Sequence, residues 1–435
     1  MTRISRRTAL SLAAGAVTAP LASTSAVAAA PARTRRPSTS GRNPVVRVEL
    51  ITTVTPSENW RVTAVAIRYA ERIDLRGGTI PPSTFTVTAT VNGQTGPRTV
   101  SRIYANTSAA VADRGRPGDH LIIELDPADP NARASAGDPL PLDRAYAIRQ
   151  VADVTSRGGD VVLPASPFVV RNDGTVNPVV DDFTAASFTD SSGFELDFRL
   201  FQPEEVVRHP DRSIRYPLVI TLHGGGEVAD NNMTQLTGSR IAVTFAKPDR
   251  QRRHPAFVLA PQIPLPRPMD GPDGTDWTDA RVQAATVALI DAFVARHPVD
   301  PKRIYLVGLS SGGRGIYSLL PKYPDKFAAA VPTAGWGDAS TMGQITHVPL
   351  WVDHSIDDPV VPYREGRFGK PGTWTLMNAL EAAGVRVTRG EWANNLPKGE
   401  FEALSRALLH QARTTDSHVL FTSYTPGTTS PCPCP

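Results

Sequence analysis

The residues best suited to chemistry lie between Gly308 and Gly312, where Gly-Leu-Ser-Ser-Gly fits the pattern G-x-S-x-G. The apolar run 304–307 before it indicates a buried strand, and the residues after it favour a helix. In such a strand-to-helix turn the serine, here Ser310, points out of the sheet, and the flanking glycines let strand and helix approach closely. The N–H groups at the start of the helix can face a developing negative oxygen. We therefore expect Ser310 to be a nucleophile.

A second glycine-rich turn follows the apolar run 217–222. The sequence His223-Gly224-Gly225-Gly226 matches the HGGG loop, whose backbone N–H helps form an oxyanion hole together with the N–H after the nucleophile. We expect Gly225 and Ser311 to be the two donors. One such donor is typically worth about 2.7–4 kcal/mol in the transition state. An ordinary glycine turn is the alternative when this motif stands alone.

A carboxylate that could orient a catalytic imidazole is expected after the nucleophile in the chain. The apolar strand 350–352 leads into a loop with two adjacent acids, Asp357 and Asp358. Either one could hold a histidine and stabilise its charged form. His354 ends the strand that supplies the acid, so we expect it to pack in the loop and not to act as the base.

The order of elements from residue 194 onward predicts the framework that positions these groups. The alternating segment 194–200 indicates a half-exposed strand at a sheet edge. Beyond it, strands and helices alternate, which implies a mainly parallel sheet with helices on both faces and active groups at the carboxyl ends of the strands. The expected strands are 217–222, 256–260, 304–307, 327–331, 350–352, 385–391 and 419–424, and the expected helices are 279–297, 312–320, 373–383 and 400–412.

The preceding region, residues 45–170, has an all-β pattern. Short segments rich in Val, Ile, Thr and aromatic residues alternate with Gly- and Pro-containing turns, which is typical of a small immunoglobulin-like sandwich. We see no catalytic constellation there, and a structural or substrate-presenting role is the simplest interpretation. The expected strands are 45–54, 60–69, 85–91, 99–104, 121–125 and 145–151.

The N-terminus has the features of an export signal. Arg6-Arg7 precedes an apolar stretch, and small residues end near residue 28, so residues 1–28 resemble a twin-arginine signal peptide and residues 29–43 a linker. Residues 1–43 contain seven Arg and no acid, so the remainder of this chain with formal charge +4 carries −3. Nothing in this balance favours nucleic-acid binding. No later run is long and apolar enough to span a membrane.

Residues 194–425 resemble the α/β-hydrolase fold, close to the secreted esterases related to poly(3-hydroxybutyrate) depolymerases and feruloyl esterases. The matching stretches are 216–227, 230–232, 300–305, the elbow 308–312, 323–332 and 358–362. This resemblance implies Asp358 as the acid, an ester substrate that is either small or polymeric, and no metal or organic cofactor. Some family members carry an immunoglobulin-like domain before the hydrolase domain, which fits residues 45–170.

The resemblance also implies a catalytic histidine after the last strands, followed by a terminal helix. Past Asp358 the chain has only His410, within a predicted helix, and His418, just before the last predicted strand. Of the two we favour His418 as the base. The tail 426–435 contains no histidine and ends in Pro-Cys-Pro-Cys-Pro, with Cys432 and Cys434 as the two cysteines of the chain. We expect a C-terminus that is truncated or frame-shifted.

The sequence as a whole predicts an exported serine hydrolase that cleaves carboxylic esters through an acyl-enzyme. Two alternatives remain open: a serine peptidase of the prolyl-oligopeptidase type, and a non-catalytic binding protein on a hydrolase scaffold that lacks its base. Trp277 and Trp336 lie in loops near the expected cleft, where they either contact substrate or pack in the interior.

Overall fold

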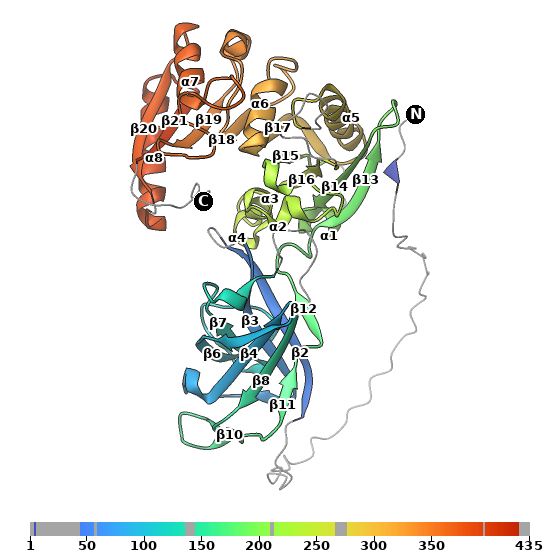
Figure 1. Cartoon of the computed structure of the whole chain (residues 1–435), viewed down its shortest axis with the longest axis vertical. Helices are drawn as coiled ribbons and strands as arrows, with labels where there is room; N and C mark the ends of the chain where they lie inside the picture. The colour runs from blue at the N-terminus through green and yellow to red at the C-terminus, as the bar shows by residue number, and fades with distance from the viewer. Residues whose placement is uncertain are drawn as a thin grey trace, which may run out of the picture.

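The computed structural model describes residues 4–5, 44–55, 59–134, 144–208, 213–265, 276–394 and 396–425. Two parts follow one another along the chain: a β domain, blue to green at the bottom of Figure 1, and a larger α/β domain above it. The predicted linker, the Pro/Cys tail 426–435 and all of the predicted signal peptide except β1 (Ile4–Ser5) lie outside the described residues.

The β domain is a sandwich of two sheets. One sheet has the order β12-β2-β3-β7-β6 and the other the order β11-β8-β4-β5. Alternate residues of β4 are buried, as expected for strands with one face on a core. The strands are β2 (Val45–Thr55), β3 (Asn59–Ile73), β4 (Phe85–Val91), β5 (Gln94–Arg98), β6 (Val100–Asn106), β7 (Gly118–Leu125), β8 (Arg144–Gln150), β11 (Val169–Arg171) and β12 (Gly174–Val176), with a small hairpin of β9 (Val154–Thr155) and β10 (Val161–Leu163) and two 3-10 turns, η1 (Pro82–Thr84) and η2 (Pro130–Ala132).

This domain continues past the expected boundary at residue 170. Strand β11 pairs with β8 through Arg171, and β12 lies parallel to β2. Each of these segments is three residues long, which is too short for an alternation pattern to show in the sequence. Their pairing places the connection to the α/β domain after Val176.

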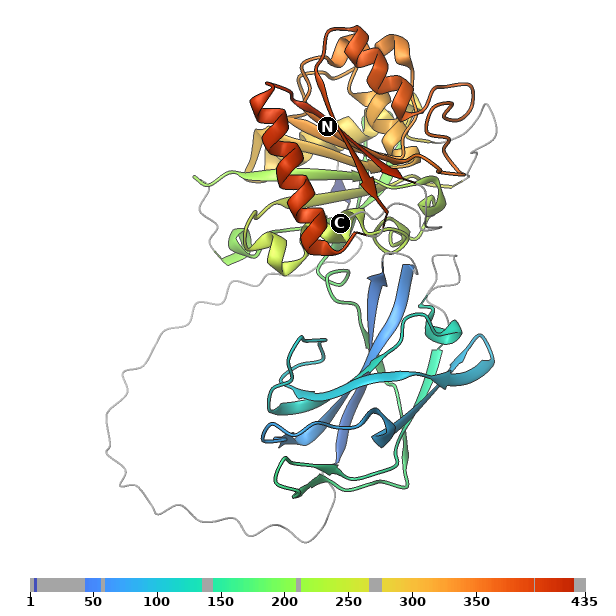
Figure 2. The same ribbon diagram turned by 90° about the vertical axis from the view of Figure 1, so that its left-hand side faces the viewer.

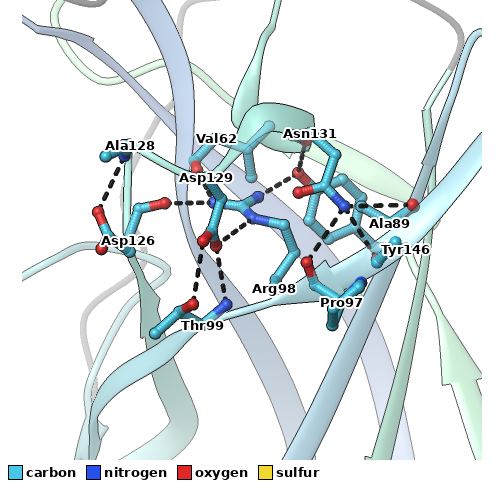
Figure 3. A network of polar contacts seen from close by, with 11 residues as sticks. Val62, Ala89, Pro97, Arg98, Thr99, Asp126, Ala128, Asp129, Asn131 and Tyr146 are labelled. Carbon is cyan, nitrogen blue, oxygen red and sulfur yellow. Dashed lines mark hydrogen bonds and ion pairs between the residues drawn. The ribbon is translucent and has the colours of Figure 1, made fainter.

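A buried arginine connects the two sheets of the sandwich (Figure 3). The Arg98 side chain, on β5, is 0% exposed and pairs through Nε with Asp129 Oδ2 at 3.0 Å. Its Nη2 donates to the carbonyl oxygen of Val62 on β3, in the other sheet, at 3.0 Å, and to that of Asp126 at 2.8 Å. Its Nη1 donates to the hydroxyl of Tyr146 on β8. One guanidinium therefore satisfies polar groups from both sheets and from the loop after β7.

The α/β domain contains a sheet with the order β1-β13-β14-β16-β15-β17-β18-β19-β21-β20. The strands from β16 to β20 in this order are parallel, whereas β13 and β14 are antiparallel to their neighbours. The bounds are β13 (Thr184–Thr189), β14 (Glu195–Phe201), β15 (Tyr216–Leu222), β16 (Phe257–Gln262), β17 (Val299–Leu309), β18 (Ala329–Thr333), β19 (Leu350–Ser355), β20 (Val387–Ala393) and β21 (Val419–Thr425).

Helices cover both faces of this sheet. Helices α5 (Ala280–Arg296), α6 (Ser311–Leu319) and α7 (Thr373–Ala382) contribute to the main core together with Leu218, Leu306 and Val352 of the strands. Residues that alternate with these, such as Val219 and Val307, pack on the other face with α3 (Ile241–Ala246). Helix α8 (Lys398–Thr414), red in Figure 2, packs on β20 and β21. The remaining helical turns are α1 (Glu204–Arg208), α2 (Thr234–Thr237), α4 (Pro248–Gln251), η3 (Gly225–Glu227) and η4 (Ala339–Ile345).

The architecture is the expected α/β-hydrolase fold preceded by an immunoglobulin-like sandwich, with one difference in the sheet. Strand β14, expected at the edge of the sheet, pairs on its outer side with β13. The polar sequence of β13 does not show the alternation that would predict a strand. The last strand in the chain, β21, lies between β19 and β20, a position for which the sequence made no prediction. In the part of the chain that the structure describes, no helix is both long and apolar enough to cross a membrane.

Candidate active site

Ser310 stands alone between β17 and α6 in a conformation that few residues adopt. Its φ is 54° and its ψ is −113°, while both neighbours belong to regular elements. The turn is held by two backbone hydrogen bonds, from Ser310 N–H to the carbonyl oxygen of Thr333 at 2.9 Å and from Arg314 N–H to the carbonyl oxygen of Ser310 at 3.0 Å. Such a conformation costs of the order of 1–3 kcal/mol and persists only where the surroundings impose it. The strained strand–turn–helix predicted for 308–312 is therefore present.

The two glycines of the motif are required by close backbone approach. A Cβ at Gly312 would lie 1.9 Å from the carbonyl oxygen of Leu222, and a Cβ at Gly308 would lie 2.5 Å from that of Gly312. Real Cβ contacts do not reach such distances, so no larger residue fits without moving the backbone. Because Leu222 ends β15, Gly312 also packs the elbow against the start of the glycine loop.

The register of β15 and β17 places the two predicted oxyanion donors at the same level. Leu222 pairs with Gly308, and Gly225 and Ser311 each come three residues later in their own chain segments. Gly225 begins η3 and Ser311 begins α6, and both residues are buried. The first N–H groups of a helical turn have no partner within it and are available to an anion. The structure thus places both segments at the same edge of the sheet, after neighbouring strands.

His223 holds the glycine loop in place through hydrogen bonds of its ring. Its ring is 0% exposed, its Nδ1 lies 2.7 Å from the carbonyl oxygen of Gly224, and its Nε2 accepts from the Ile263 N–H at 3.0 Å. Since Nε2 is an acceptor, the proton must be on Nδ1, which donates to Gly224. Trp277 Nε1 donates to the His223 carbonyl oxygen at 2.8 Å. Both ring nitrogens are committed to the backbone, so His223 positions the loop and does not serve as a base.

The buried ring predicts a measurable pH dependence of stability. Burial lowers the pKa of His223 from 6.5 to about 4 in the folded chain. The neutral ring therefore contributes stability that is fully present above pH 6.5 and is lost as the pH falls through about 4. The loss should reach about 3 kcal/mol in the free energy of unfolding, at 1.36 kcal/mol per pKa unit. Urea unfolding between pH 7 and pH 4 should show a steeper decline for the native chain than for His223→Gln. The matched control, His347→Gln, replaces a half-exposed histidine and should keep the slope of the native chain. Equal slopes in all three proteins would mean that the buried His223 ring is not the cause of the decline.

Asp358 lies in the loop just after β19 in a hydrogen-bonded turn. Its Oδ1 accepts from the N–H groups of Val360 and Val361 at 2.8 and 2.9 Å, and its Oδ2 is 3.5 Å from His354 Nε2. Burial alone would raise its pKa, but the hydrogen bonds from His354, Val361 and Val360 outweigh that effect and lower it. The carboxylate is therefore ionised, fixed and 18% exposed.

The neighbouring groups differ from Asp358 in ways that matter for the choice of acid. Asp357 is exposed and accepts a hydrogen bond from Ser355 Oγ at 2.7 Å. His354 is 0% exposed and bonds through Nε2 to the carbonyl oxygen of Val361 at 2.9 Å, as expected for a histidine that packs in the loop. Of the two adjacent acids, Asp358 has the fixed position that an orienting carboxylate needs.

His418 lies at the wrong end of the sheet to reach Ser310. The next residue, Val419, pairs with Leu350 at the start of β19, and His418 Nε2 is 2.7 Å from the carbonyl oxygen of Thr346. The strands are parallel, so their starts and the elbow occupy opposite edges. His410 is exposed on α8, which packs on β20 and β21. The structure does not bring either histidine together with Ser310.

None of the other histidines of the described region is positioned as the base for Ser310. Several precede strands and so lie at the same distant edge: His254 before β16, His297 before β17 and His347 before β19. His120 belongs to the β domain. Only His223 and His354 lie near the carboxyl ends of the described strands. His223 has both ring nitrogens bonded to the backbone, and His354 is 0% exposed with its Nε2 placed between the Val361 carbonyl oxygen and Asp358. Within the described residues, no imidazole is placed to accept a proton from Ser310.

The two tryptophans considered as substrate contacts are both buried. Trp277 is 1% exposed, packs edge-on to His223 and lies against Gly315 of α6. Trp336 is 3% exposed, and the Arg314 guanidinium lies 5.7 Å from its ring centre. Sequence reasoning missed the supporting roles of His223 and Trp277. The adjacency of His223 to the glycine run is the only signal that the sequence offered.

A strained serine elbow at the carboxyl end of a mainly parallel sheet defines this chain as an α/β-hydrolase. The family model for the esterase immunoglobulin-like N-terminal domain matches residues 47–163, and that for the prolyl oligopeptidase family matches residues 276–388. A solved structure described as a thermostable esterase is 30% identical over 89% of this chain and 94% of its own, with a TM-score of 0.69. The chain belongs to this family of esterases, which join an immunoglobulin-like domain to an α/β-hydrolase domain.

Two curated relatives match shorter segments. Poly(3-hydroxyalkanoate) depolymerase C of Paucimonas lemoignei is 43% identical over 47 residues, 11% of this chain and 11% of its own. An uncharacterized secreted protein of Arthroderma benhamiae is 28% identical over 163 residues, 36% of this chain and 15% of its own. The chain thus matches only a small part of the length of these two relatives. The resemblance to esterases expected from the sequence is confirmed, and that to a polyester depolymerase is confirmed over a short segment.

Proposed function

We propose that this protein is an exported serine hydrolase that cleaves carboxylic esters through a Ser310 acyl-enzyme. The observation that carries the proposal is the Ser310 backbone, with φ 54° and ψ −113°, held between β17 and α6 by its neighbours. A structural serine has no need of such strain, whereas a nucleophile needs its hydroxyl lifted out of the sheet and facing a helix N-terminus.

The proposed reaction proceeds in two acyl-transfer steps. Ser310 Oγ attacks the ester carbonyl carbon while its proton passes to a base, and the resulting oxyanion receives hydrogen bonds from the Gly225 and Ser311 N–H groups. The base returns the proton to the alcohol as it leaves. Water then attacks the acyl-enzyme, releasing the acid and restoring Ser310. Asp358 is proposed to orient the base and stabilise its charged form.

The last described strand, β21, ends close to the proposed acid. This strand runs parallel to β19, and its residue Tyr424 pairs with Ser355, three residues before Asp358. The chain therefore leaves β21 at the edge where Ser310 and Asp358 lie. Residues 426–435 contain no histidine, and the described histidines do not bond to Ser310. We therefore propose that Ser310, Asp358 and the oxyanion donors have no imidazole partner among the described residues and this tail.

An ester substrate fits the whole chain better than a peptide. The family model for prolyl oligopeptidases covers only residues 276–388, whereas the likeness to the thermostable esterase extends over both domains. The name of the Paucimonas lemoignei relative adds polyesters of hydroxy acids to the candidate substrates. The Arthroderma benhamiae relative is described as secreted, which agrees with the proposed export through the twin-arginine sequence at the N-terminus.

The test compares p-nitrophenyl butyrate with the matched butyryl p-nitroanilide, using the native chain and Ser310→Ala. We expect slow ester turnover that Ser310→Ala removes, and no anilide turnover above background. A fluorophosphonate probe should label the native chain at Ser310, as mapped by mass spectrometry. Anilide cleavage at a comparable rate would favour the peptidase alternative. An unlabelled Ser310 with equal rates in both proteins would favour a non-catalytic binding protein.

A further inference from the structure

A cavity of about 340 Å³ lies along the flank of α6, the helix that begins directly after the proposed nucleophile. Its wall includes Arg314, Tyr317, Ser318 and Pro321. Arg314, Tyr317 and Pro321 follow Ser310 at helical spacing, so they form one stripe that starts at the elbow. At 1.5 Å of rise per residue, Arg314 is about 6 Å and Ser318 about 12 Å along the helix from Ser310. A substrate group attached at Ser310 must therefore span about this length to reach Ser318.

A buried glutamine fixes two polar groups on the cavity wall. Gln283 of α5 is 2% exposed, and its Nε2 donates to the carbonyl oxygen of Trp277 at 2.9 Å and to Ser318 Oγ at 2.8 Å. Both amide protons are used, so the remaining Oε1 is the acceptor that faces Lys322 Nζ. The buried Gln283 side chain thus fixes the positions of Ser318 and Lys322 through hydrogen bonds.

These two wall residues present hydrogen-bond donors. Ser318 Oγ accepts from Gln283, which leaves its own proton to be donated to a group in the cavity. The Lys322 ammonium carries three protons and gives one to the neutral amide oxygen of Gln283. The cavity wall therefore offers donors to a ligand atom that only accepts hydrogen bonds, as the oxygens of an ionised carboxylate do.

The charges around the cavity favour the same ligand. Three cations and one carboxylate, Asp338, line it. Lys370 pairs with Asp338 at 2.6 Å, and Arg314 pairs with Asp276 from the loop before α5. Within the described region, Lys322 is the lining cation that has no carboxylate partner. The positive charge of Lys322 is therefore available to pair with a carboxylate of a ligand.

We propose that this cavity binds a carboxylate at the far end of the ester substrate, held by Lys322 Nζ and Ser318 Oγ. This inference rests on the proposed ester hydrolysis at Ser310. The separation along α6 suits an acyl chain with a terminal acid, as in a monoester of a medium-chain dicarboxylic acid or an oligomer of hydroxy acids. Neutral esters of the same length gain nothing from the cavity.

The test uses two p-nitrophenyl esters that differ only at the far end, the monosuberate and the octanoate, assayed with imidazole present. Lys322→Gln should lower kcat/KM for the monosuberate about three- to tenfold and change that for the octanoate less than about twofold. Ser318→Ala should act in the same direction, and added salt should shrink the difference. Lys326→Gln is the matched control, because Lys326 pairs with Asp291 and does not line the cavity. An equal loss on both esters, or the same loss in the control, would overturn the proposal.

A binding measurement separates this proposal from the proposed function. Suberate itself, which needs no chemistry, should bind the full chain more tightly by calorimetry than it binds Lys322→Gln. If neither ester is hydrolysed but suberate shows this difference, the carboxylate site stands and the hydrolase proposal fails. If the esters are hydrolysed but suberate binds both proteins equally, the site is overturned and the hydrolase proposal stands.

Discussion

Imidazole added to the 435-residue chain should raise Ser310-dependent hydrolysis of p-nitrophenyl butyrate by about 10- to 100-fold. The physical reason is the arrangement at the carboxyl edge of the sheet. Ser310, the loop of Gly225 and the start of α6 are assembled there, but His223 is bonded to the backbone through both ring nitrogens and His354 is buried with its Nε2 bonded to the Val361 carbonyl oxygen. A positioned acid–base group contributes about 10²–10⁴-fold. A diffusing imidazole recovers only part of that, because it is not held in place.

The measurement is the initial rate against imidazole concentration at several pH values. The increase should follow the neutral form of imidazole, since only that form accepts the serine proton. Imidazole also cleaves activated esters without an enzyme, so Ser310→Ala at each concentration supplies the background. Parallel slopes for the two proteins would contradict the proposal. So would a native chain that is already fast without imidazole, because a base would then lie within residues 1–435.

The parts of this site that could be foreseen are those encoded locally. The residues 308–312 combine a buried strand, two glycines and a helix start, and each is a property of adjacent residues. The glycines are needed because a Cβ atom at Gly312 or Gly308 would clash with the carbonyl oxygen of Leu222 or of Gly312. The spacing of the motif places glycine at both positions. Strand and helix order after residue 194 likewise follows from local apolar runs, as in α5, which Asp279 caps and which spans the predicted helix 279–297.

The parts that could not be foreseen depend on contacts between distant segments. Nothing in residues 419–425 indicates that β21 inserts between β19 and β20, because strand order is decided by packing across the whole sheet. The anchoring of His223 by Ile263 joins residues 40 positions apart. Similarly, β13 and β12 are too short and too polar for their pairing to show as an alternation in the sequence.

Arg98→Met should destabilise the β domain by about 3–5 kcal/mol, the largest stability effect we expect. Methionine fills a similar volume but donates no hydrogen bond. The substitution leaves the carbonyl oxygens of Val62 and Asp126 without this donor, and it leaves Asp129, 14% exposed, with only its bonds to Thr99 at 2.8 and 3.0 Å (Figure 3). Removing one partner of a buried ion pair is costly because the other charge stays buried without compensation.

The matched control is Arg76→Met on the same domain. Arg76 pairs with Asp160 at 3.2 Å, but the two side chains are 70% and 71% exposed, so its loss should cost less than about 0.5 kcal/mol. Urea unfolding of the full chain gives the size of each effect, and hydrogen exchange of peptides from β3, β5 and β8 shows where it acts. Faster exchange in those strands, with the α/β domain unchanged, is the expected result for Arg98→Met. Equal effects of the two substitutions would mean that the arginine joining the sheets is no more important than a surface pair, and that apolar packing alone holds the sandwich together.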